Sequence, residues 1–487
     1  MKLHKPVALL ALAAFPLLFA NGRNTIAVAA WLAPVFLLRY VRTVRVRIAF
    51  PAVFALLFGM WLFQFRGMVP APAPIVIGVA LSYAFLGLGP YALDRLLVRT
   101  NASGALSTLL FPCAAAALEF IFLSLSPYGS WGSVAYSQYG NLPLMQLASV
   151  TGLYGITFLV MWLASTLNRA WESGPRWSAL WFVAVTTVVL IAGGARFTFF
   201  APGATRVRIA GITPEHFKSF PNDAAENRFW SKQPVSDSDL NFTRAAFARA
   251  ADDLLTKSDR EARAGARLVF WSEGAAPVLR ADEPALLAKG AGLARRDGIW
   301  LGMAMTSFAR EQRKPMRNKF ALIGPDGRVL YEYWKSRPVP GGEAQLSETN
   351  GNAMRYADTA LGRAATFICF DLDFPRLVRQ AGAAQADLLL APSNDWRAID
   401  PWHTQMAGFR AVENGVNLFR DTGHGLSMAV DYQGRVLAQA DYFNAPDHRS
   451  VAYLPTRGVP TIYSQVGDLF GWLATAGLAG LAFLLRR

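Results

Sequence analysis

Eight apolar segments of roughly membrane-spanning length constrain this chain more than any other feature. These segments lie at residues 6–20, 26–38, 48–65, 73–93, 104–126, 144–166, 178–197 and 466–485. The composition agrees with them, because 53% of the 487 residues are hydrophobic, which is more than an ordinary soluble protein carries. We therefore predict a multi-pass α-helical membrane domain of about eight helices.

Basic residues alternate between the connections of these segments. The connections on one side, including both chain ends, contain 12 Lys and Arg residues, whereas those on the other side contain 2. By the positive-inside rule, both termini lie in the cytoplasm. The basic excess thus orients the chain in a membrane and accounts for the formal charge of +15. Nucleic-acid binding is therefore not expected.

One long hydrophilic block, residues 204–455, follows the seventh segment and is expected outside the cytoplasm. Its size suits one large domain. We predict a membrane domain of seven helices at residues 1–203, an extracytoplasmic domain at 204–455 and a last membrane helix at 456–487. A cleaved signal peptide is the alternative for the first segment, but its end lacks a small residue at the usual outer position. The large domain stays on the same side in either case.

Within the hydrophilic block, short apolar runs alternate with stretches of helical periodicity, which is typical of an α/β domain. Strands are predicted at 206–212, 266–274, 299–308, 364–370 and 387–395. Helices are predicted at 240–258, 283–298, 374–386 and 404–415. A hairpin is predicted at 318–336, where "GPDG" forms the turn, and a second hairpin is predicted at 426–441.

Three of the predicted strand ends carry reactive side chains. Glu273 closes "LVFWSE", Lys335 closes "VLYEYWK" and Cys369 closes "AATFIC". Taken singly, they are typical of a loop acid, a surface lysine and a buried core cysteine. Together they suit acyl transfer, with a thiol that attacks a carbonyl, a carboxylate that takes its proton and a cation that stabilises the oxyanion. The helix start after Cys369 is expected to favour the thiolate.

The chain has only two cysteines, so no disulfide framework is expected. Cys113 lies in the apolar stretch "LLFPCAAAALEF". Cys369 is therefore either a buried filler or a working thiol.

The order Glu, Lys, Cys resembles that of the nitrilase superfamily, and "CFDLDFPRL" and "LLLAPSND" look like its nucleophile turn and following strand. This resemblance implies an αββα sandwich. The apolar segments on both sides of the hydrophilic block narrow the resemblance to one family, the apolipoprotein N-acyltransferases. The stretches similar to that family are "WSEGAAP", "WKSRPVPGGE", "SNDWRAIDPWHTQMAGFRAVENG", "PYGSWGSVAYSQYG" and "TIYSQVGDLFGW".

The resemblance implies the roles of five residues. Cys369 would be the nucleophile of a ping-pong reaction, Glu273 the general base and later acid, and Lys335 part of the oxyanion hole. Glu343 would orient Lys335 or share the proton transfer, and Phe370 would support the nucleophile. The chain departs from the family pattern at several places: Phe370 and Asp371 stand where Tyr and Glu are common, Ser272 stands where Pro is usual, and "TGHGLS" replaces a stretch that often contains Asn-Gly.

The same resemblance implies the substrates and the location. The acyl donor would be a phospholipid, the acceptor the N-terminal amine of diacylglyceryl-cysteine in a lipoprotein, and membrane lipids would surround the chain. The enzyme would lie in the bacterial inner membrane with its catalytic domain on the periplasmic side. No cofactor and no metal are implied, because the five histidines are scattered and are not in ligand spacing with the cysteines.

Two features of the membrane part invite a functional interpretation. Glu119 lies inside an apolar segment, where an unpaired charge is costly, so it is expected to face the bundle interior. A structural role there is favoured over contact with substrate. The uncharged loop "SPYGSWGSVAYSQYG" is either an interfacial belt or the floor of a headgroup site.

Two other functions remain open from the sequence. A membrane-tethered nitrilase-type amidase would use the same three residues and let water resolve the acyl-enzyme. A non-enzymatic binding platform with a nitrilase fold is the second, but a decayed site would be expected to have lost at least one of Glu273, Lys335 and Cys369.

Overall fold

The protein is described by a computed structural model that covers residues 4–98, 105–174, 177–214, 236–351, 353–445 and 447–486. The chain divides into two compact units. A helical unit comprises Met1–Ala201 together with Thr461–Arg487, and an α/β unit comprises Pro202–Pro460.

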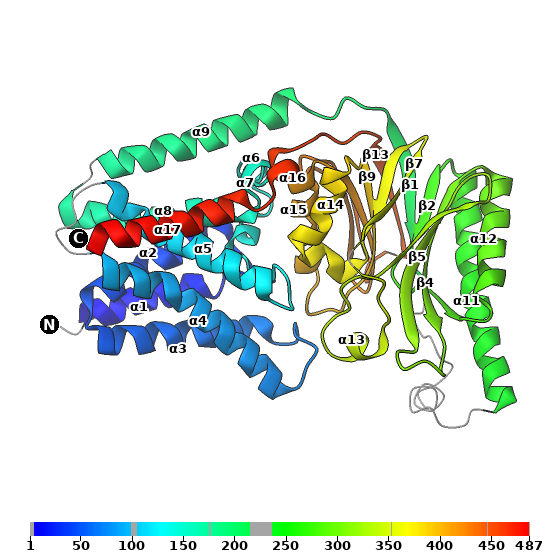
Figure 1. Cartoon of the computed structure of the whole chain (residues 1–487), viewed down its shortest axis with the longest axis horizontal. Helices are drawn as coiled ribbons and strands as arrows, with labels where there is room; N and C mark the ends of the chain where they lie inside the picture. Colours follow the sequence, from blue (N-terminus) through cyan, green and yellow to red (C-terminus); the bar gives the residue numbers. More distant parts are fainter. Residues whose placement is uncertain are drawn as a thin grey trace. The chain divides into compact units, whose positions relative to one another are not determined.

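The described part of the helical unit consists of helices and connecting loops. Its elements are α1 (His4–Leu17), α2 (Ala27–Thr43), α3 (Val46–Phe65), α4 (Ala73–Leu97), η1 (Ala105–Thr108), α5 (Leu110–Leu125), η2 (Val134–Gln138), α6 (Leu142–Met145), α7 (Ala148–Thr151), α8 (Leu153–Ser173), α9 (Trp177–Phe199), α16 (Ile462–Val466) and α17 (Leu469–Arg486). In Figure 1, α17 lies alongside α5, although the whole α/β unit separates them along the chain. The rings of Phe120 and Trp472 meet edge to face at 5.0 Å in this contact.

Helices occupy all eight predicted apolar segments. Among the described residues, four helices are long and apolar enough to cross a membrane: Val46–Phe65, Ala73–Leu97, Leu106–Leu125 and Trp177–Phe199. Three apolar helices in the same part of the chain have 10–17 residues: Pro6–Leu17, Leu142–Thr151 and Leu469–Leu485. These helices agree with the predicted helical membrane domain.

The segment 144–166 differs from the single helix predicted for it, because the structure divides it among α6, α7 and α8. Gly152 separates α7 from α8 with φ +63°. A Cβ atom at this position would lie only 2.6 Å from the ring of Tyr463. The close approach of Tyr463, together with the left-handed backbone, therefore requires glycine here and breaks the helix.

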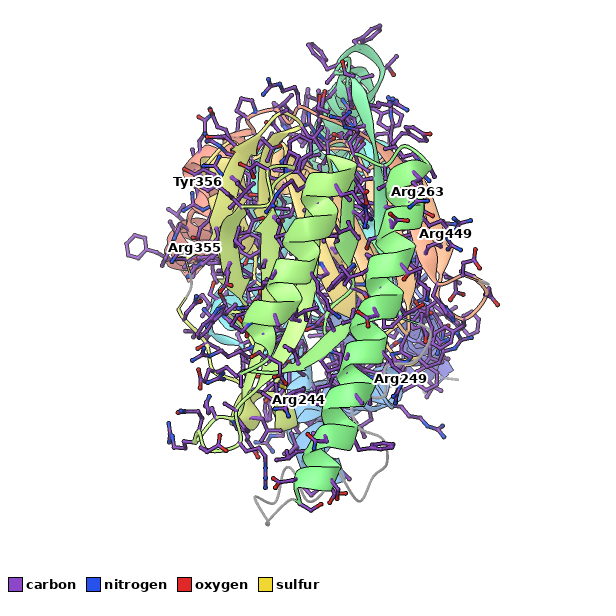
Figure 2. All side chains as sticks on the ribbon, turned by 90° about the vertical axis from the view of Figure 1, so that its right-hand side faces the viewer. Arg244, Arg249, Arg263, Arg355, Tyr356 and Arg449 are labelled. Carbon is purple, nitrogen blue, oxygen red and sulfur yellow. The ribbon has the colours of Figure 1, made fainter. Side chains whose placement is uncertain are left out.

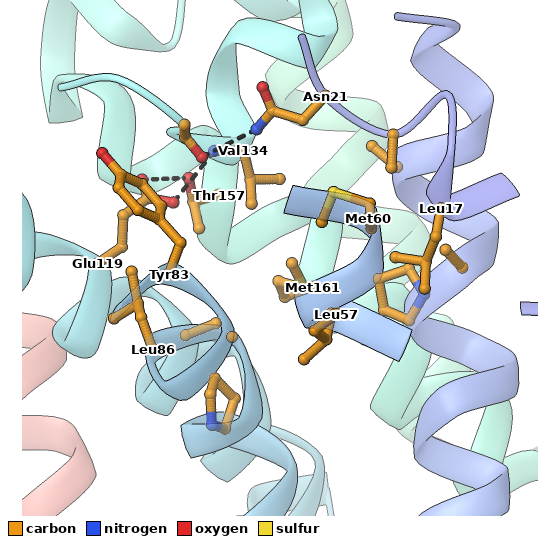
Figure 3. A pocket seen from close by; sticks show the side chains of 18 of the residues that line it. Leu17, Asn21, Leu57, Met60, Tyr83, Leu86, Glu119, Val134, Thr157 and Met161 are labelled. Atoms are coloured by element: carbon orange, nitrogen blue, oxygen red, sulfur yellow. Dashed lines mark hydrogen bonds between the residues drawn. The ribbon is translucent and has the colours of Figure 1, made fainter. Parts of the chain in front are cut away.

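Glu119 of α5 faces the interior of the helical unit, as predicted, and is 6% exposed. Its carboxylate accepts hydrogen bonds from Ser133 Oγ and Thr157 Oγ1, both at 2.8 Å, and from the backbone N–H of Val134 at 3.1 Å. It borders an apolar cavity of about 120 Å³, seen from close by in Figure 3. Glu119 thus fastens the uncharged loop to α5 and α8, which agrees with a structural role.

The described part of the α/β unit contains two sheets. The seven-stranded sheet has the order β13-β1-β2-β4-β5-β6, with β3 paired to β4. Its strands are β1 (Arg206–Ile212), β2 (Leu268–Trp271), β3 (Ala276–Leu279), β4 (Trp300–Phe308), β5 (Met316–Ile323), β6 (Val329–Trp334) and β13 (Arg449–Pro455). The six-stranded sheet has the order β12-β11-β10-β9-β8-β7. Its strands are β7 (Arg355–Thr359), β8 (Gly362–Thr366), β9 (Leu388–Asn394), β10 (Asn417–Gly423), β11 (Leu426–Val430) and β12 (Val436–Asp441).

The two sheets pack face to face, and helices cover the outer face of each. Phe270 of β2 and Phe419 of β10 meet edge to face at 5.2 Å between the sheets. The covering helices are α11 (Asp237–Arg263) and α12 (Glu283–Asp297) on the seven-stranded sheet, and α14 (Pro375–Ala383) and α15 (Trp402–Asn414) on the six-stranded sheet. Figure 2 shows α11 and α12 side by side, with the exposed Arg244, Arg249 and Arg263 along α11. The predicted αββα sandwich is therefore confirmed.

Four strands were not predicted from the sequence: β3, β7, β10 and β13. The strand β10 lies in the middle of its sheet and is buried along its whole length. Its sequence "NLFRDTG" places Arg420 and Asp421 where an apolar run would be expected. These polar side chains made the strand hard to recognise. In the interior, Arg420 is paired with Asp395, and Asp421 accepts hydrogen bonds from the hydroxyls of Ser427 and Ser450.

Candidate active site

The three predicted reactive residues come from the ends of strands in both sheets. Glu273 follows β2 and Lys335 follows β6 in the seven-stranded sheet, whereas Cys369 follows β8 in the six-stranded sheet. The backbone N–H of Glu273 donates to the carbonyl oxygen of Ser393 in β9 at 3.3 Å, which joins the two sheets at this point. The fold therefore brings together residues that are about 100 positions apart in the sequence.

Lys335 forms the centre of a buried ion-pair cluster. Its side chain is 3% exposed, and its Nζ lies 2.7 Å from Glu273 Oε1 and 2.8 Å from Glu343 Oε2. Burial by itself would lower the pKa of Lys335, but the charges of Glu273 and Glu343 raise it well above its ordinary value. Lys335 is thus a fixed cation at neutral pH, held between two carboxylates. Glu343 lies on the short helix α13 (Gly342–Leu346) and also accepts from the N–H of Val339 at 2.8 Å.

Asn318 completes this cluster, and sequence reasoning missed it. Its Nδ2 donates to Glu273 Oε1 at 2.7 Å and to Glu343 Oε1 at 3.1 Å, and its backbone carbonyl oxygen accepts from the N–H of Lys335 at 2.9 Å. The side chain therefore orients both carboxylates, and the backbone of the same residue pairs with that of the lysine. The sequence signal was weak, because an asparagine at the start of a hairpin is also typical of a surface turn.

Cys369 opens the 3₁₀ turn η3 (Cys369–Asp373) in a strained conformation. Its φ is +47°, a left-handed value that costs a residue other than glycine about 1–3 kcal/mol and is concentrated at functional sites. The side chain is buried, and its Sγ lies 3.7 Å from the carbonyl oxygen of Asn394 at the end of β9. A sharp turn after a strand thus presents the sulfur where the two sheets meet.

The thiol is not activated by its surroundings alone. Burial, together with the negative charge of Glu273, raises the pKa of Cys369 well above its ordinary value, and the cation of Lys335 opposes this rise only in part. Any preference for the thiolate from the helix start is therefore outweighed in the resting site. A base must take the proton as the thiol reacts, and Glu273 lies close enough for its charge to act on this thiol.

Asp371 holds the nucleophile turn and the lysine loop together. It is fully buried and accepts hydrogen bonds from the backbone N–H groups of Ser336 at 3.1 Å, Arg337 at 2.7 Å and Ile368 at 3.0 Å. The hydroxyl of Tyr333 donates to it at 2.8 Å. Since the N–H of Ile368 is used in this way, regular pairing of β8 ends at Thr366, before the end predicted for the strand.

Phe370, predicted to support the nucleophile, is 5% exposed and packs edge to face on Phe374 at 5.3 Å. The guanidinium of Arg337 lies over the same Phe374 ring at 5.0 Å. The aromatic pair therefore braces η3 against the loop that follows Lys335. No hydroxyl is available at Phe370, so its contribution is packing.

A second group of charges lies beside Cys369 and was not predicted. His403 on α15 is buried between Asp373 and Asp395, with Nε2 3.1 Å from Asp373 Oδ2 and Nδ1 2.7 Å from Asp395 Oδ1. Arg420 of β10 binds both oxygens of Asp395, at 2.8 and 3.1 Å. The spacing of the histidines along the sequence gave no sign that His403 lies beside Cys369.

The donor atoms of Cys369, Asp395 and His403 all lie within 4.8 Å of one another, which is close enough to be tested as a metal site. The residues do not fit that role. Both ring nitrogens of His403 already face carboxylates, and the Arg420 cation lies 2.8 Å from Nδ1. A metal ion would have to displace these contacts and approach a guanidinium.

Two family models match this chain, one in each unit. The model for carbon-nitrogen hydrolases matches residues 240–445, and the model for the N-terminal domain of apolipoprotein N-acyltransferases matches residues 7–166. Relatives named apolipoprotein N-acyltransferase match across both parts. The chain therefore combines a carbon-nitrogen hydrolase domain with the N-terminal domain of apolipoprotein N-acyltransferases, and it is similar to proteins of that name over most of its length.

Three such relatives illustrate the extent of the similarity. The protein of Geobacter metallireducens is 28% identical over 445 residues, which cover 85% of this chain and 81% of the relative. That of Bradyrhizobium diazoefficiens is 27% identical, covering 83% and 78% respectively. That of Haemophilus influenzae is also 27% identical, covering 70% and 67%. The apolipoprotein N-acyltransferase similarity therefore includes most of both units.

Among solved structures, an amidase from Nesterenkonia sp. is similar, with 19% identity and a TM-score of 0.42. The match covers 55% of this chain and 95% of the amidase.

Proposed function

We propose that this protein is an apolipoprotein N-acyltransferase that moves an acyl chain from a lipid to a lipoprotein through a thioester on Cys369. The observation that carries this proposal is the buried cluster of Glu273, Lys335 and Glu343 beside the strained Cys369. The two family matches support the reaction class, because they combine a carbon-nitrogen hydrolase domain with the membrane domain of these acyltransferases. We further propose that the donor is a phospholipid and the acceptor the α-amine of diacylglyceryl-cysteine.

The first half-reaction would form the thioester. Glu273 takes the proton of the Cys369 thiol, and the sulfur attacks the ester carbonyl of the donor lipid. The Lys335 ammonium and a backbone N–H of the nucleophile turn stabilise the oxyanion, and one such donor typically contributes about 3 kcal/mol to lowering the barrier. As the C–O ester bond breaks, Glu273 returns the proton to the leaving alkoxide, which departs as lysophospholipid.

The second half-reaction would release the acyl chain to the amine. The neutral α-amine attacks the thioester carbonyl, Glu273 accepts a proton from the attacking nitrogen, and the C–S bond breaks to form the amide. The proton then returns to the sulfur, which restores the resting thiol. The buried setting of Cys369, which is 3% exposed, supports transfer over hydrolysis, because water competes poorly for a thioester that it cannot reach.

Mass spectrometry of the acyl-enzyme tests this function. Full-length protein in detergent is incubated with a phospholipid of defined chains and no acceptor, and Cys369 is expected to gain a hydroxylamine-sensitive mass equal to one acyl group. Addition of a diacylglyceryl-cysteine peptide should remove this mass and yield an N-acylated peptide. Cys369→Ala should show neither product. Release of free fatty acid in place of the amide would favour a hydrolase, and an unmodified Cys369 in an active enzyme would contradict the mechanism.

We also propose that the chain lies in the bacterial inner membrane with its α/β unit on the periplasmic side. The distribution of 12 against 2 basic residues between the two sets of connections supports this orientation. A reporter that is active only in the periplasm, fused after the C-terminus, is expected to stay inactive. An active reporter there would contradict the orientation.

A further inference from the structure

The charge cluster around His403 connects two backbone segments that surround the nucleophile. Asp373 is the last residue of η3, the turn that Cys369 opens. Asp395 directly follows Asn394, whose carbonyl oxygen lies 3.7 Å from Cys369 Sγ. Because His403 contacts both carboxylates from the first turn of α15, it ties the far end of the nucleophile turn to the end of β9.

The charges of this cluster balance only if the imidazole is protonated. Asp373 and Asp395 contribute two negative charges and Arg420 one positive charge, and all of these side chains are buried. An imidazolium at His403 makes the group neutral, whereas a neutral ring would leave an uncompensated charge in the interior, which is costly. Burial tends to lower the pKa of His403, but Asp373 and Asp395 raise it to about 9.

The imidazolium lies close enough to the thiol to influence it. A ring nitrogen of His403 and Cys369 Sγ are within 4.8 Å of each other. Among the described residues, the charged and titratable groups that face His403 include Asp373 from η3, Asp395 after β9, Arg420 from β10 and the Cys369 thiol. The mechanism proposed above, which uses the side chains of Cys369, Glu273 and Lys335, gives no role to this ring.

We propose that His403 is a positioning residue for Cys369: clamped between Asp373 and Asp395, it fixes the nucleophile turn against the end of β9 and keeps a positive charge beside the sulfur. Removal of the ring should misplace Sγ and disfavour the thiolate, and it should leave lipid binding alone. The expected change in kcat rests on the proposed function, but the reactivity of the thiol itself can be measured without any lipid.

The test uses full-length protein in detergent carrying Cys113→Ser, so that Cys369 is the only thiol in the chain. The rate of its alkylation by iodoacetamide is measured against pH, together with kcat and KM for acyl transfer. In His403→Gln and Asp373→Asn, alkylation should slow and its pH midpoint should rise. A small misplacement of a reacting atom can cost about 10²-fold in rate, so kcat should fall by roughly that factor while KM stays within about twofold.

Two further variants separate positioning from general destabilisation. Asp373→Glu keeps the carboxylate and should recover part of the alkylation rate. Glu413→Gln is the matched control, because Glu413 lies on the same helix α15 in a buried ion pair with Arg410 at 3.1 Å. It removes one buried carboxylate from α15 and should leave the alkylation profile unchanged, even if it lowers the melting temperature.

The proposal is overturned if folded His403→Gln and Asp373→Asn keep the wild-type alkylation profile. It is also overturned if Glu413→Gln slows alkylation equally, since the effect would then belong to the stability of α15. If His403→Gln does not fold, the alkylation profile of the isosteric variant Asp373→Asn decides whether the proposal holds. A wild-type protein that transfers no acyl group, but whose alkylation depends on His403, would contradict the proposed function and leave this inference standing.

Discussion

The backbone N–H of Arg337 donates a hydrogen bond of 2.7 Å to Asp371 Oδ1, although 34 residues separate the two along the chain. The other oxygen of Asp371 accepts from the N–H of Ile368 at 3.0 Å. One buried carboxylate thus binds the segment that follows Lys335 and the residue that precedes Cys369. The cation and the nucleophile of the proposed mechanism are therefore positioned relative to each other through Asp371, which touches neither reacting atom in this arrangement.

Asp371→Asn is expected to lower kcat by roughly 10²-fold, because a carboxamide offers one acceptor oxygen and turns an NH₂ group toward the remaining backbone donors. A buried donor left without an acceptor costs about 1–3 kcal/mol, so the melting temperature should also fall. Asp371→Glu, which keeps both acceptor oxygens, should retain more activity than Asp371→Asn. Kinetics and thermal unfolding of the purified variants check this. An Asn variant with wild-type kcat would show that the link between the two loops is not needed.

Lys335→Arg is expected to abolish turnover although it keeps the positive charge. The compact ammonium of Lys335 fits between Glu273 and Glu343 at 2.7 and 2.8 Å in a buried site, whereas the planar guanidinium needs more room and a different donor geometry. Acyl transfer and the acyl-enzyme are measured by mass spectrometry. Activity close to wild type in Lys335→Arg would remove the lysine from the oxyanion hole.

Lys335→Met provides the matched control for charge. It leaves the buried Glu273 and the partly exposed Glu343 without their cation, and breaking a buried pair in this way typically costs about 3–5 kcal/mol. We therefore expect Lys335→Met to unfold at a lower temperature than Lys335→Arg, with neither variant active. Equal melting temperatures would indicate that the arginine is not accommodated in the cluster either.

The sequence predicted the parts of this protein that depend on local patterns. Hydropathy located the helical segments, and periodicity located α11, α12, α14 and α15 within a few residues. Glu273, Lys335 and Cys369 could be proposed together because each ends an apolar strand and because their order resembles a known superfamily. Local patterns were sufficient wherever one chemical property repeats along a segment.

Contacts between distant segments could not be predicted in this way. The buried strand β10 contains Arg420 and therefore lacks the apolar pattern of a core strand. The partner that makes this arginine acceptable in the interior, Asp395, comes from the end of another strand. His403 lies beside Cys369 only because α15 packs against the nucleophile turn. Gly152 divides a predicted helix because the ring of Tyr463, from the other end of the chain, takes the space of its side chain. Each of these depends on tertiary packing that overrides the local sequence.

The stability of the protein should depend on pH through His403. Its pKa is about 9 in the folded chain, above the ordinary value of 6.5, because Asp373 and Asp395 outweigh the effect of burial. A group whose pKa is raised by folding stabilises the folded state fully below its ordinary pKa, and this contribution is lost as the pH rises through the folded value. The difference in melting temperature between wild type and His403→Gln should therefore be largest below about pH 6.5 and shrink toward pH 9. A difference that is constant over this range would contradict the protonated state of His403.

Glu119 should be replaceable by glutamine but not by alanine. Its three donors are the hydroxyls of Ser133 and Thr157 and the backbone N–H of Val134. A glutamine can accept from Val134 with its oxygen and donate to both hydroxyls with its NH₂ group, since hydroxyls also accept. An alanine leaves the three groups without their acceptor beside an apolar cavity, at a cost of about 1–3 kcal/mol for each group that stays unsatisfied. Glu119→Ala should therefore lower the melting temperature in detergent and the amount of protein in the membrane, while Glu119→Gln keeps both, together with acyl transfer. If Glu119→Gln folded normally but lost transfer, the negative charge itself would be required, and a contact of Glu119 with substrate would replace its structural role.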